Sequence, residues 1–242
     1  MFRLTACFVL LVFVTNSFGQ DFKLTSVFRS EYVFGNGVLV SDKPVIQTDL
    51  YIGFENGLWL DFWGSVPADF SDIGKDFATE LYPTFGWSGK VDNYKLTFSA
   101  GYDDLNRAGT LEKTDFVVLV GEISRDFEIS KSFTVTPFLH VETNFTFDGA
   151  VTGDTLPRFG SYYSWKLNDT LSLGGKAYVL YDPGILFCQT ALIGSVEAAL
   201  HWNISENVTI ELPYARFIAP ITGVSDGRKE EMIFGAGVSF KF

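Results

Sequence analysis

Along most of this chain, apolar and polar residues alternate one by one, a period typical of β-strands whose two faces meet different surroundings. In the last segment Met232, Phe234 and Phe240 share one face, whereas Glu231 and Lys241 share the other. Comparable segments predict about twelve strands, at residues 22–34, 44–55, 57–66, 79–88, 93–102, 114–126, 132–147, 158–168, 170–181, 189–203, 207–218 and 230–242.

The connections between these segments alternate in length. Five are short polar turns, at residues 55–57, 88–92, 128–131, 168–169 and 205–206. The others are longer and rich in Gly, Pro and Asp, at residues 35–43, 67–78, 103–113, 148–157, 182–188 and 219–229. Short periplasmic turns and longer extracellular loops are typical of bacterial outer-membrane barrels. The pattern therefore predicts an all-β fold, a closed antiparallel up-and-down transmembrane β-barrel.

A secreted soluble β-sandwich also alternates, with its apolar faces turned inward, and it remains the alternative fold. Two considerations favour the membrane barrel. A closed barrel satisfies every backbone hydrogen bond, which a lipid environment demands. Aromatic residues also gather near the predicted strand ends, where interfacial girdles lie: Tyr32, Phe34, Phe54, Trp87, Tyr94, Tyr102, Phe127, Phe133, Phe147, Phe159, Tyr181, Trp202, Phe217 and Phe242.

Residues 1–19 have the features of a secretory signal peptide. Arg3 supplies the positive charge, residues 4–14 form an apolar stretch too short to span a bilayer, and Gly19 ends a small-residue cleavage site. We expect this segment to be removed and residues 20–242 to form a single barrel domain, exported through the inner membrane to the outer membrane. Cys188 is then the one remaining cysteine, so we expect no internal disulfide.

Composition narrows the function classes. A net charge of −11 disfavours nucleic acid as a partner, because phosphate contacts need clustered Lys and Arg. Two histidines are too few for a His-rich metal site, and no motif indicates a cofactor. The acidic excess suggests a weak preference for cations, or divalent ions that bridge the loops to lipopolysaccharide. A merely solvated loop surface is the simpler explanation.

Short motifs in the first part of the chain follow a known order. SEYVFG at 30–35, PVIQTDL at 44–50, NGLW at 56–59 and FWGS at 62–65 precede an acidic Glu80 that opens the next strand and a Gly101-Tyr102 pair. Over residues 25–102 this order resembles the TorF-type porin family of Gram-negative bacteria. The chain departs from it in placing Gly35 directly after Phe34, where the family often has an Arg. The resemblance implies an outer-membrane location and a pore, but no agreed substrate.

The polar faces of the predicted strands supply candidate pore-lining residues. Trp59, Asp61 and Trp63 form one stripe, whose flat rings either guide a solute such as a sugar or nucleoside, or fill the barrel and block it. We predict a porin-like channel for passive diffusion of small solutes. The full candidate set is Asp49, Trp59, Asp61, Trp63, Glu80, Lys95, His140, Glu142 and Glu197.

Two other functions remain open. One is a closed structural or adhesive surface barrel that acts through its outer loops. The other, more distant, is a membrane-embedded hydrolase, which would need a Ser–His pair. His140 and His201 both fall on the predicted lumenal face and neither lies in a Ser-rich motif, so we predict no catalytic residues and no enzyme.

The expected partners follow from the membrane barrel. They are outer-membrane lipid, lipopolysaccharide, small solutes and the barrel assembly machinery. The last is expected because a terminal Phe242 after an alternating strand resembles the signal that this machinery reads.

Overall fold

The computed structural model describes residues 21–70, 79–105, 115–146, 152–185 and 188–242. The signal peptide predicted at residues 1–19 lies outside these ranges. The elements are β1 (Asp21–Arg29), β2 (Tyr32–Val33), β3 (Leu39–Ser41), β4 (Val45–Gly53), β5 (Leu58–Pro67), β6 (Glu80–Val91), β7 (Tyr94–Leu105), β8 (Phe116–Ser124), β9 (Phe127–Ser130), β10 (Phe133–Thr146), β11 (Thr152–Lys166), β12 (Leu171–Asp182), β13 (Ala191–Asn203), β14 (Val208–Pro220) and β15 (Glu231–Lys241).

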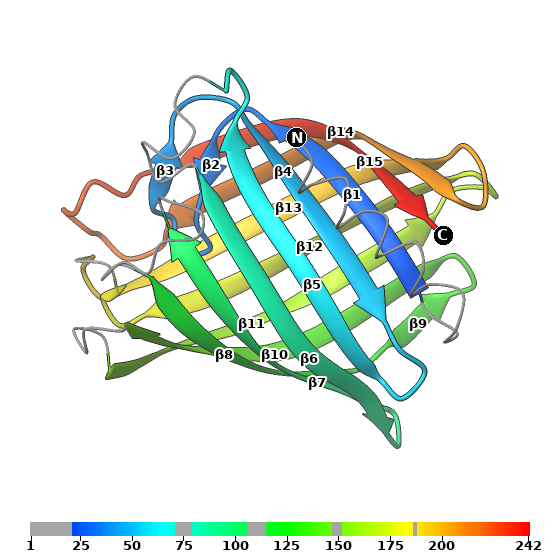
Figure 1. Cartoon of the computed structure of the whole chain (residues 1–242), viewed down its shortest axis with the longest axis horizontal. Coiled ribbons are helices and arrows are strands. Elements are labelled where there is room, and N and C mark those ends of the chain that lie inside the picture. Colours follow the sequence, from blue (N-terminus) through cyan, green and yellow to red (C-terminus); the bar gives the residue numbers. More distant parts are fainter. Residues whose placement is uncertain (1–20, 71–78, 106–114, 147–151, 186–187) are drawn as a thin grey trace, which may run out of the picture.

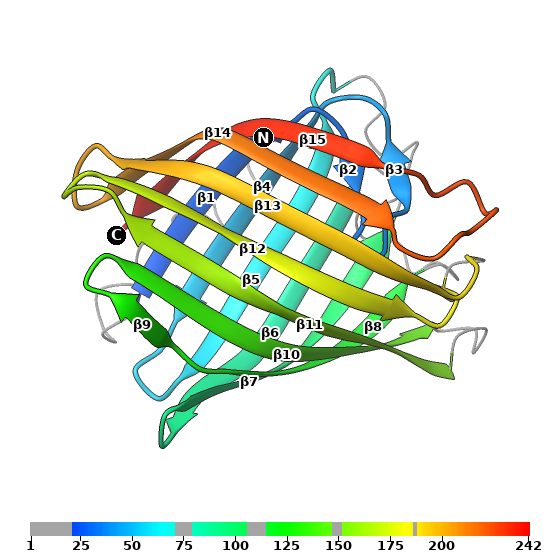
Figure 2. The same ribbon diagram turned by 180° about the vertical axis from the view of Figure 1, so that it is seen from behind.

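The sheet closes on itself into a barrel (Figures 1 and 2). β1 pairs antiparallel with β4 on one side and with β15 on the other, and β10 pairs with β11. β9 continues β8 along the same partner, β10, so that the chain crosses the barrel wall in twelve passes. The prediction of a closed antiparallel barrel of about twelve strands is confirmed.

The connections sort by length to the two ends of the barrel. The strand ends that border the long connections gather at the left and upper left in Figure 1, and the short turns lie at the opposite end. Both described chain ends lie at the short-turn end, where the Phe242 amide donates to the Phe22 carbonyl over 2.9 Å. In the part of the chain that the structure describes, no helix has the length and apolar character needed to cross a bilayer.

The apolar faces of the strands point outward. Phe98, Phe159 and Phe234 are each more than half exposed on the outer surface of their strands. A contiguous apolar surface of this kind is not left in water by a soluble monomer. The sandwich alternative, which would pack these faces together inside, is therefore wrong. Aromatic side chains near the strand ends include the exposed Tyr94, Phe127, Trp165, Tyr181, Trp202 and Phe242.

The first predicted strand is wrong in its second half. It ends at Arg29 rather than at residue 34, and residues 32–41 form the small hairpin β2–β3. Tyr32 and Val33 are buried, at 8% and 3% exposure, so Tyr32 is not part of an aromatic girdle. Phe34 packs against the two clusters of buried apolar residues that contain Tyr32 and Val33. Alternation continues through residue 34, but tertiary contacts turn the chain inward there.

The strand β11 begins six residues before its predicted start. Residues 152–157 had the Gly, Asp and Pro content of a loop, yet Leu156 pairs with Glu142 of β10 in the barrel wall. Because cross-strand hydrogen bonds and burial of Leu156 stabilise this segment, its weak strand propensity does not decide its conformation.

A glycine contact in the wall gives a test of strand packing. A Cβ added at Gly175, on the outward face of β12, would lie 2.0 Å from the Glu197 carbonyl oxygen and 2.5 Å from the Tyr163 hydroxyl. We expect Gly175→Ala to destabilise the barrel by about 1–3 kcal/mol, because the backbone carbonyl cannot move aside. Gly121→Ala, also on an outward face, is the control, since its nearest contact would be 3.8 Å away. Urea unfolding in lipid vesicles measures both, and equal effects would contradict the packing.

Candidate functional site

The hairpin β2–β3 folds into the barrel and is held there from several sides. The Tyr32 hydroxyl donates to the Glu80 carboxylate of β6. On the opposite wall Arg216 of β14 donates to the Val33 carbonyl over 3.2 Å, and the Tyr178 hydroxyl donates to the Gly35 carbonyl over 3.3 Å. These contacts fix the hairpin across the long-loop end of the lumen, where it narrows the passage.

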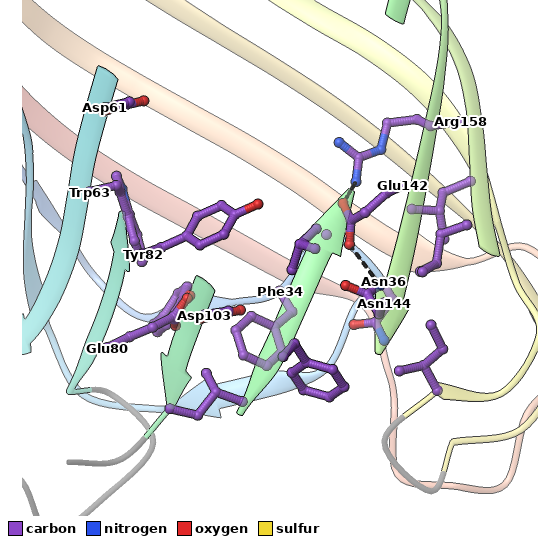
Figure 3. A pocket seen from close by; sticks show the side chains of 18 of the residues that line it. Phe34, Asn36, Asp61, Trp63, Glu80, Tyr82, Asp103, Glu142, Asn144 and Arg158 are labelled. Atoms are coloured by element: carbon purple, nitrogen blue, oxygen red, sulfur yellow. Dashed lines mark hydrogen bonds and ion pairs between the residues drawn. The ribbon is translucent and has the colours of Figure 1, made fainter. Parts of the chain in front are cut away.

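Beside the hairpin lies a cavity of about 530 Å³. Figure 3 shows that two walls of opposite character face each other across it. Asp61, Trp63, Glu80, Tyr82 and Asp103 come from β5, β6 and β7, whereas Glu142, Asn144 and Arg158 come from β10 and β11. Lys176 of β12 also lines the cavity.

The wall of β5–β7 is acidic. We call Asp61, Glu80 and Asp103, together with Asp49 behind Asp61, the acidic wall. Asp49 pairs in register with Trp63 and therefore faces inward beside Asp61. Among the described residues, no Lys, Arg or His lies within salt-bridge distance of these four carboxyl groups. One carboxylate oxygen each of Asp49, Asp61 and Asp103 is buried without a hydrogen-bond partner.

The wall of β11 and β12 is basic. Arg158 and Lys176, which we call the basic wall, point into the cavity from adjacent strands. The Arg158 guanidinium lies 4.8 Å from the Tyr178 ring, with its nearest carboxylate, Glu142, at 3.9 Å. Lys176 Nζ lies 3.5 Å from a Glu197 oxygen. These ion pairs are longer than a charge-assisted hydrogen bond of about 2.7–2.9 Å, so both cations keep free capacity.

The structure places all nine sequence-predicted residues on the inward faces of their strands. Asp61, Trp63, Glu80 and Glu142 line the cavity itself. The other five residues also face inward. Asp49 and Glu197 pair in register with the cavity residues Trp63 and Lys176. An even spacing along the strand puts three more on the same face as a cavity residue: Trp59 with Asp61, His140 with Glu142, and Lys95 with Asp103.

The sequence analysis did not select three residues that line the cavity, and it did not predict the inward hairpin. Asp103 and Arg158 fall at predicted strand boundaries, and Lys176 stands on a polar face without being selected. The available signal was the alternation itself, since Leu156, Arg158 and Gly160 continue one face of β11. Nothing in the local sequence indicates that the hairpin turns inward.

A buried ionic cluster lies at the long-loop end next to the hairpin. We call Asp182, Asp226, Arg228 and Asn36 the rim cluster. Arg228 lies 2.7 Å from both Asp182 and Asp226, and it donates to the Asn36 carbonyl over 3.2 Å. The Asn36 amide in turn donates to Asp182 over 3.2 Å. The Arg228 and Asp182 side chains are 2% and 0% exposed, so the cluster ties the hairpin to β12 and to the β14–β15 loop.

The rim cluster predicts acid sensitivity. Hydrogen bonds from Arg228 lower the pKa of Asp226 to about 2, against an ordinary value near 3.8. Since the folded-state pKa is depressed, this stabilisation is complete above the ordinary value and is lost as the pH falls from about 4 towards 2. We expect the urea midpoint of wild-type barrels in lipid vesicles to drop over this range. Asp226→Asn should show a smaller drop, and an identical pH profile would contradict the assignment.

The sequence raised two kinds of chemistry, a Ser–His pair and a metal site, and the structure shows what surrounds the residues concerned. His140 Nδ1 lies 3.2 Å from Glu122 and Nε2 lies 3.9 Å from Glu142, so both ring nitrogens face carboxylates rather than a serine. Within the described ranges, no cluster of three or more His, Cys, Asp or Glu side chains could hold a metal ion.

No protein-family model matches the sequence, and no curated protein is similar to it. Solved structures do share the fold. The NanC porin aligns over 91% of this chain and 100% of its own, with a TM-score of 0.55 and 13% identity. An outer-membrane channel from Pseudomonas putida aligns over 93% and 96%, with a TM-score of 0.55 and 12% identity. The KdgM porin, solved with disordered oligogalacturonate, aligns over 92% and 99%, with a TM-score of 0.53 and 8% identity.

The fold is that of a bacterial outer-membrane β-barrel. At these identities the likeness extends to the fold alone. The β-domain of the Bordetella autotransporter BrkA has a TM-score of 0.52 to the same chain, so one architecture serves different functions. The features specific to this chain are the cavity and its charges.

Proposed function

We propose that the protein is an outer-membrane channel through which small polar solutes diffuse passively. The observation that carries this proposal is the inversion of the barrel: apolar side chains face outward, and a charged cavity of about 530 Å³ lies inside. An apolar outer band with a polar interior suits a protein that surrounds an aqueous path through lipid. The presence of porins among the solved structures of this fold also supports a channel function.

The narrowing of the lumen sets the expected size of the solutes. Twelve strands enclose less space than the 16–18 strands of water-filled porins. The hairpin β2–β3 occupies part of that space, and Val33 packs against buried interior residues. We therefore propose a narrow channel that admits small molecules and excludes larger oligomers.

The remaining assignments extend this proposal. Residues 1–19 would be a signal peptide that is removed, leaving residues 20–242 as one barrel domain, and the nine inward residues named above would line the path. Outer-membrane lipid and lipopolysaccharide would surround the barrel, and the last strand with Phe242 would engage the barrel assembly machinery. The TorF-type porins would be its family, and we propose no catalytic role.

A closed structural or adhesive barrel is the second candidate. The inward hairpin favours it, because contacts at Glu80, Arg216 and Tyr178 hold the hairpin in the lumen from opposite walls. In that case the outer loops would carry the function.

Liposome swelling separates the two candidates. Proteoliposomes that contain the purified, refolded barrel are diluted into isotonic arabinose, glucose or raffinose. The channel proposal expects fast swelling with arabinose and slower swelling as the sugar grows. A rate no faster than that of protein-free liposomes with every sugar would overturn it and favour the closed barrel. Heat-modifiable migration on detergent gels verifies that the sample is folded.

A further inference from the structure

We propose that the cavity selects zwitterionic solutes, such as amino acids and short peptides, by holding an ammonium group at the acidic wall and a carboxylate at the basic wall. This inference rests on the proposed channel function and names its substrate class. It follows from carboxyl groups without a cationic partner on one side of the cavity and from cations with only long ion pairs on the other.

The acidic wall lacks a cation of its own. Asp61 lies beside Asp49, and Asp103 lies beside Glu80, so the four carboxyl groups form two close pairs. Even where the members of a pair share one proton, each pair keeps one negative charge. One buried oxygen each of Asp61 and Asp103 has no hydrogen-bond partner, and the one donor inside the wall is a proton shared within each carboxyl pair. An ammonium group supplies both the charge and the donors.

The basic wall has capacity for an anion. Arg158 Nε is buried without a hydrogen-bond partner, and Glu142 approaches the guanidinium only to 3.9 Å. Lys176 lies on the next strand opposite Tyr162, two inward-facing positions from Arg158 along β11. A planar carboxylate matches the guanidinium fork of arginine and can bind it through two hydrogen bonds.

The two walls together exclude solutes with one kind of charge. A simple anion that approaches Arg158 meets the field of the acidic wall, and a simple cation at Asp61 meets that of Arg158 and Lys176. Only a molecule with both charges satisfies both walls. The cavity of about 530 Å³ lies within the range of about 300–1,000 Å³ that small-molecule sites occupy, and the Tyr82 side chain projects into it between the walls (Figure 3).

Single-channel recording with three matched peptides tests the inference. Dialanine carries both charges, N-acetyl-dialanine only the negative one, and dialanine amide only the positive one. We expect dialanine to occlude the open channel at a concentration about tenfold lower than either analogue, a ratio equivalent to about 1.4 kcal/mol. Equal occlusion by all three, or tighter occlusion by a singly charged analogue, would overturn the inference.

Variants of the two walls test which wall binds the carboxylate group and which binds the ammonium group. Arg158→Gln should weaken the preference of dialanine over its amide, and the double change Asp49→Asn with Asp61→Asn, which removes one carboxyl pair, should weaken the preference over the N-acetyl form. Lys166→Gln is the control, because Lys166 pairs with Asp169 in an exposed turn. Lys176→Gln replaces Arg158→Gln if that variant does not fold. A preference unchanged in the wall variants would overturn the assignment.

Failure of the inference and failure of the channel function are distinguishable. Discrete current steps without peptide discrimination would refute zwitterion selection and leave the channel intact. If no steps occur, calorimetry on the detergent-solubilised barrel still decides: dialanine binding above that of both analogues supports the site, and its absence refutes it.

Discussion

Replacing Arg228 with alanine is expected to destabilise the barrel by about 3–5 kcal/mol, because the change leaves Asp182 buried and unpaired. The Arg228 and Asp182 side chains are 2% and 0% exposed, so water cannot compensate for the lost guanidinium. The same change removes the hydrogen bond from Arg228 to the Asn36 carbonyl. The urea midpoint of folded barrels in lipid vesicles, followed by tryptophan fluorescence, measures the effect.

The neighbouring lysine provides the control for this prediction. Lys229 is 69% exposed in its 3.7 Å pair with Glu231, and an exposed pair contributes about 0–1 kcal/mol. Lys229→Ala should therefore leave the midpoint nearly unchanged. Similar shifts for the two variants would show that the rim cluster is not a buried ionic lock.

A charge on the outer face should have an effect that depends on its depth. Leu119 is 45% exposed near the middle of β8, where it pairs with Ala100 of β7. If lipid covers this face, Leu119→Arg should destabilise the barrel by about 2–4 kcal/mol, since an arginine at the bilayer midplane loses its hydration.

The matched change near the short-turn end should be mild. Ile129 is 64% exposed on β9, two residues before the turn at Lys131. Near the interface an arginine reaches water, so Ile129→Arg should shift the stability by only about 0–1 kcal/mol. The unfolding free energies of both variants are compared in the same vesicles. Two equally mild effects would mean that water, not lipid, covers Leu119.

The barrel could be predicted from the sequence because its determinants are local. Alternation with a period of two assigns each strand a face, and a one-residue error would move a whole set of side chains to the wrong side. For this reason the inward placement of Asp61, His140 and Glu197 follows from the sequence alone. The order of the strands also follows from local information, because short turns bring consecutive strands together as neighbours, whereas closure needs the distant pairing of β1 with β15.

The interior arrangement could not be predicted because its determinants are distant in sequence. Tyr32 finds its partner Glu80 48 positions away, and Arg228 reaches Asn36 across 192 positions. Local alternation through residue 34 favoured a longer first strand, but these long-range bonds turn the hairpin inward. The opposition of Arg158 to the acidic wall arises only when the barrel closes, since β11 and β5 are not neighbours in the sheet.

Planar-bilayer conductance tests whether the inward hairpin narrows a charged, conducting lumen. The wild-type barrel is compared with a variant in which a Gly-Ser linker replaces residues 32–41, after heat-modifiable migration has verified folding. We expect discrete single-channel steps for the wild type and larger steps for the variant, because removal of the hairpin widens the lumen. Steps of equal size would contradict the narrowing by the hairpin, and the absence of steps from both folded proteins would contradict the channel itself.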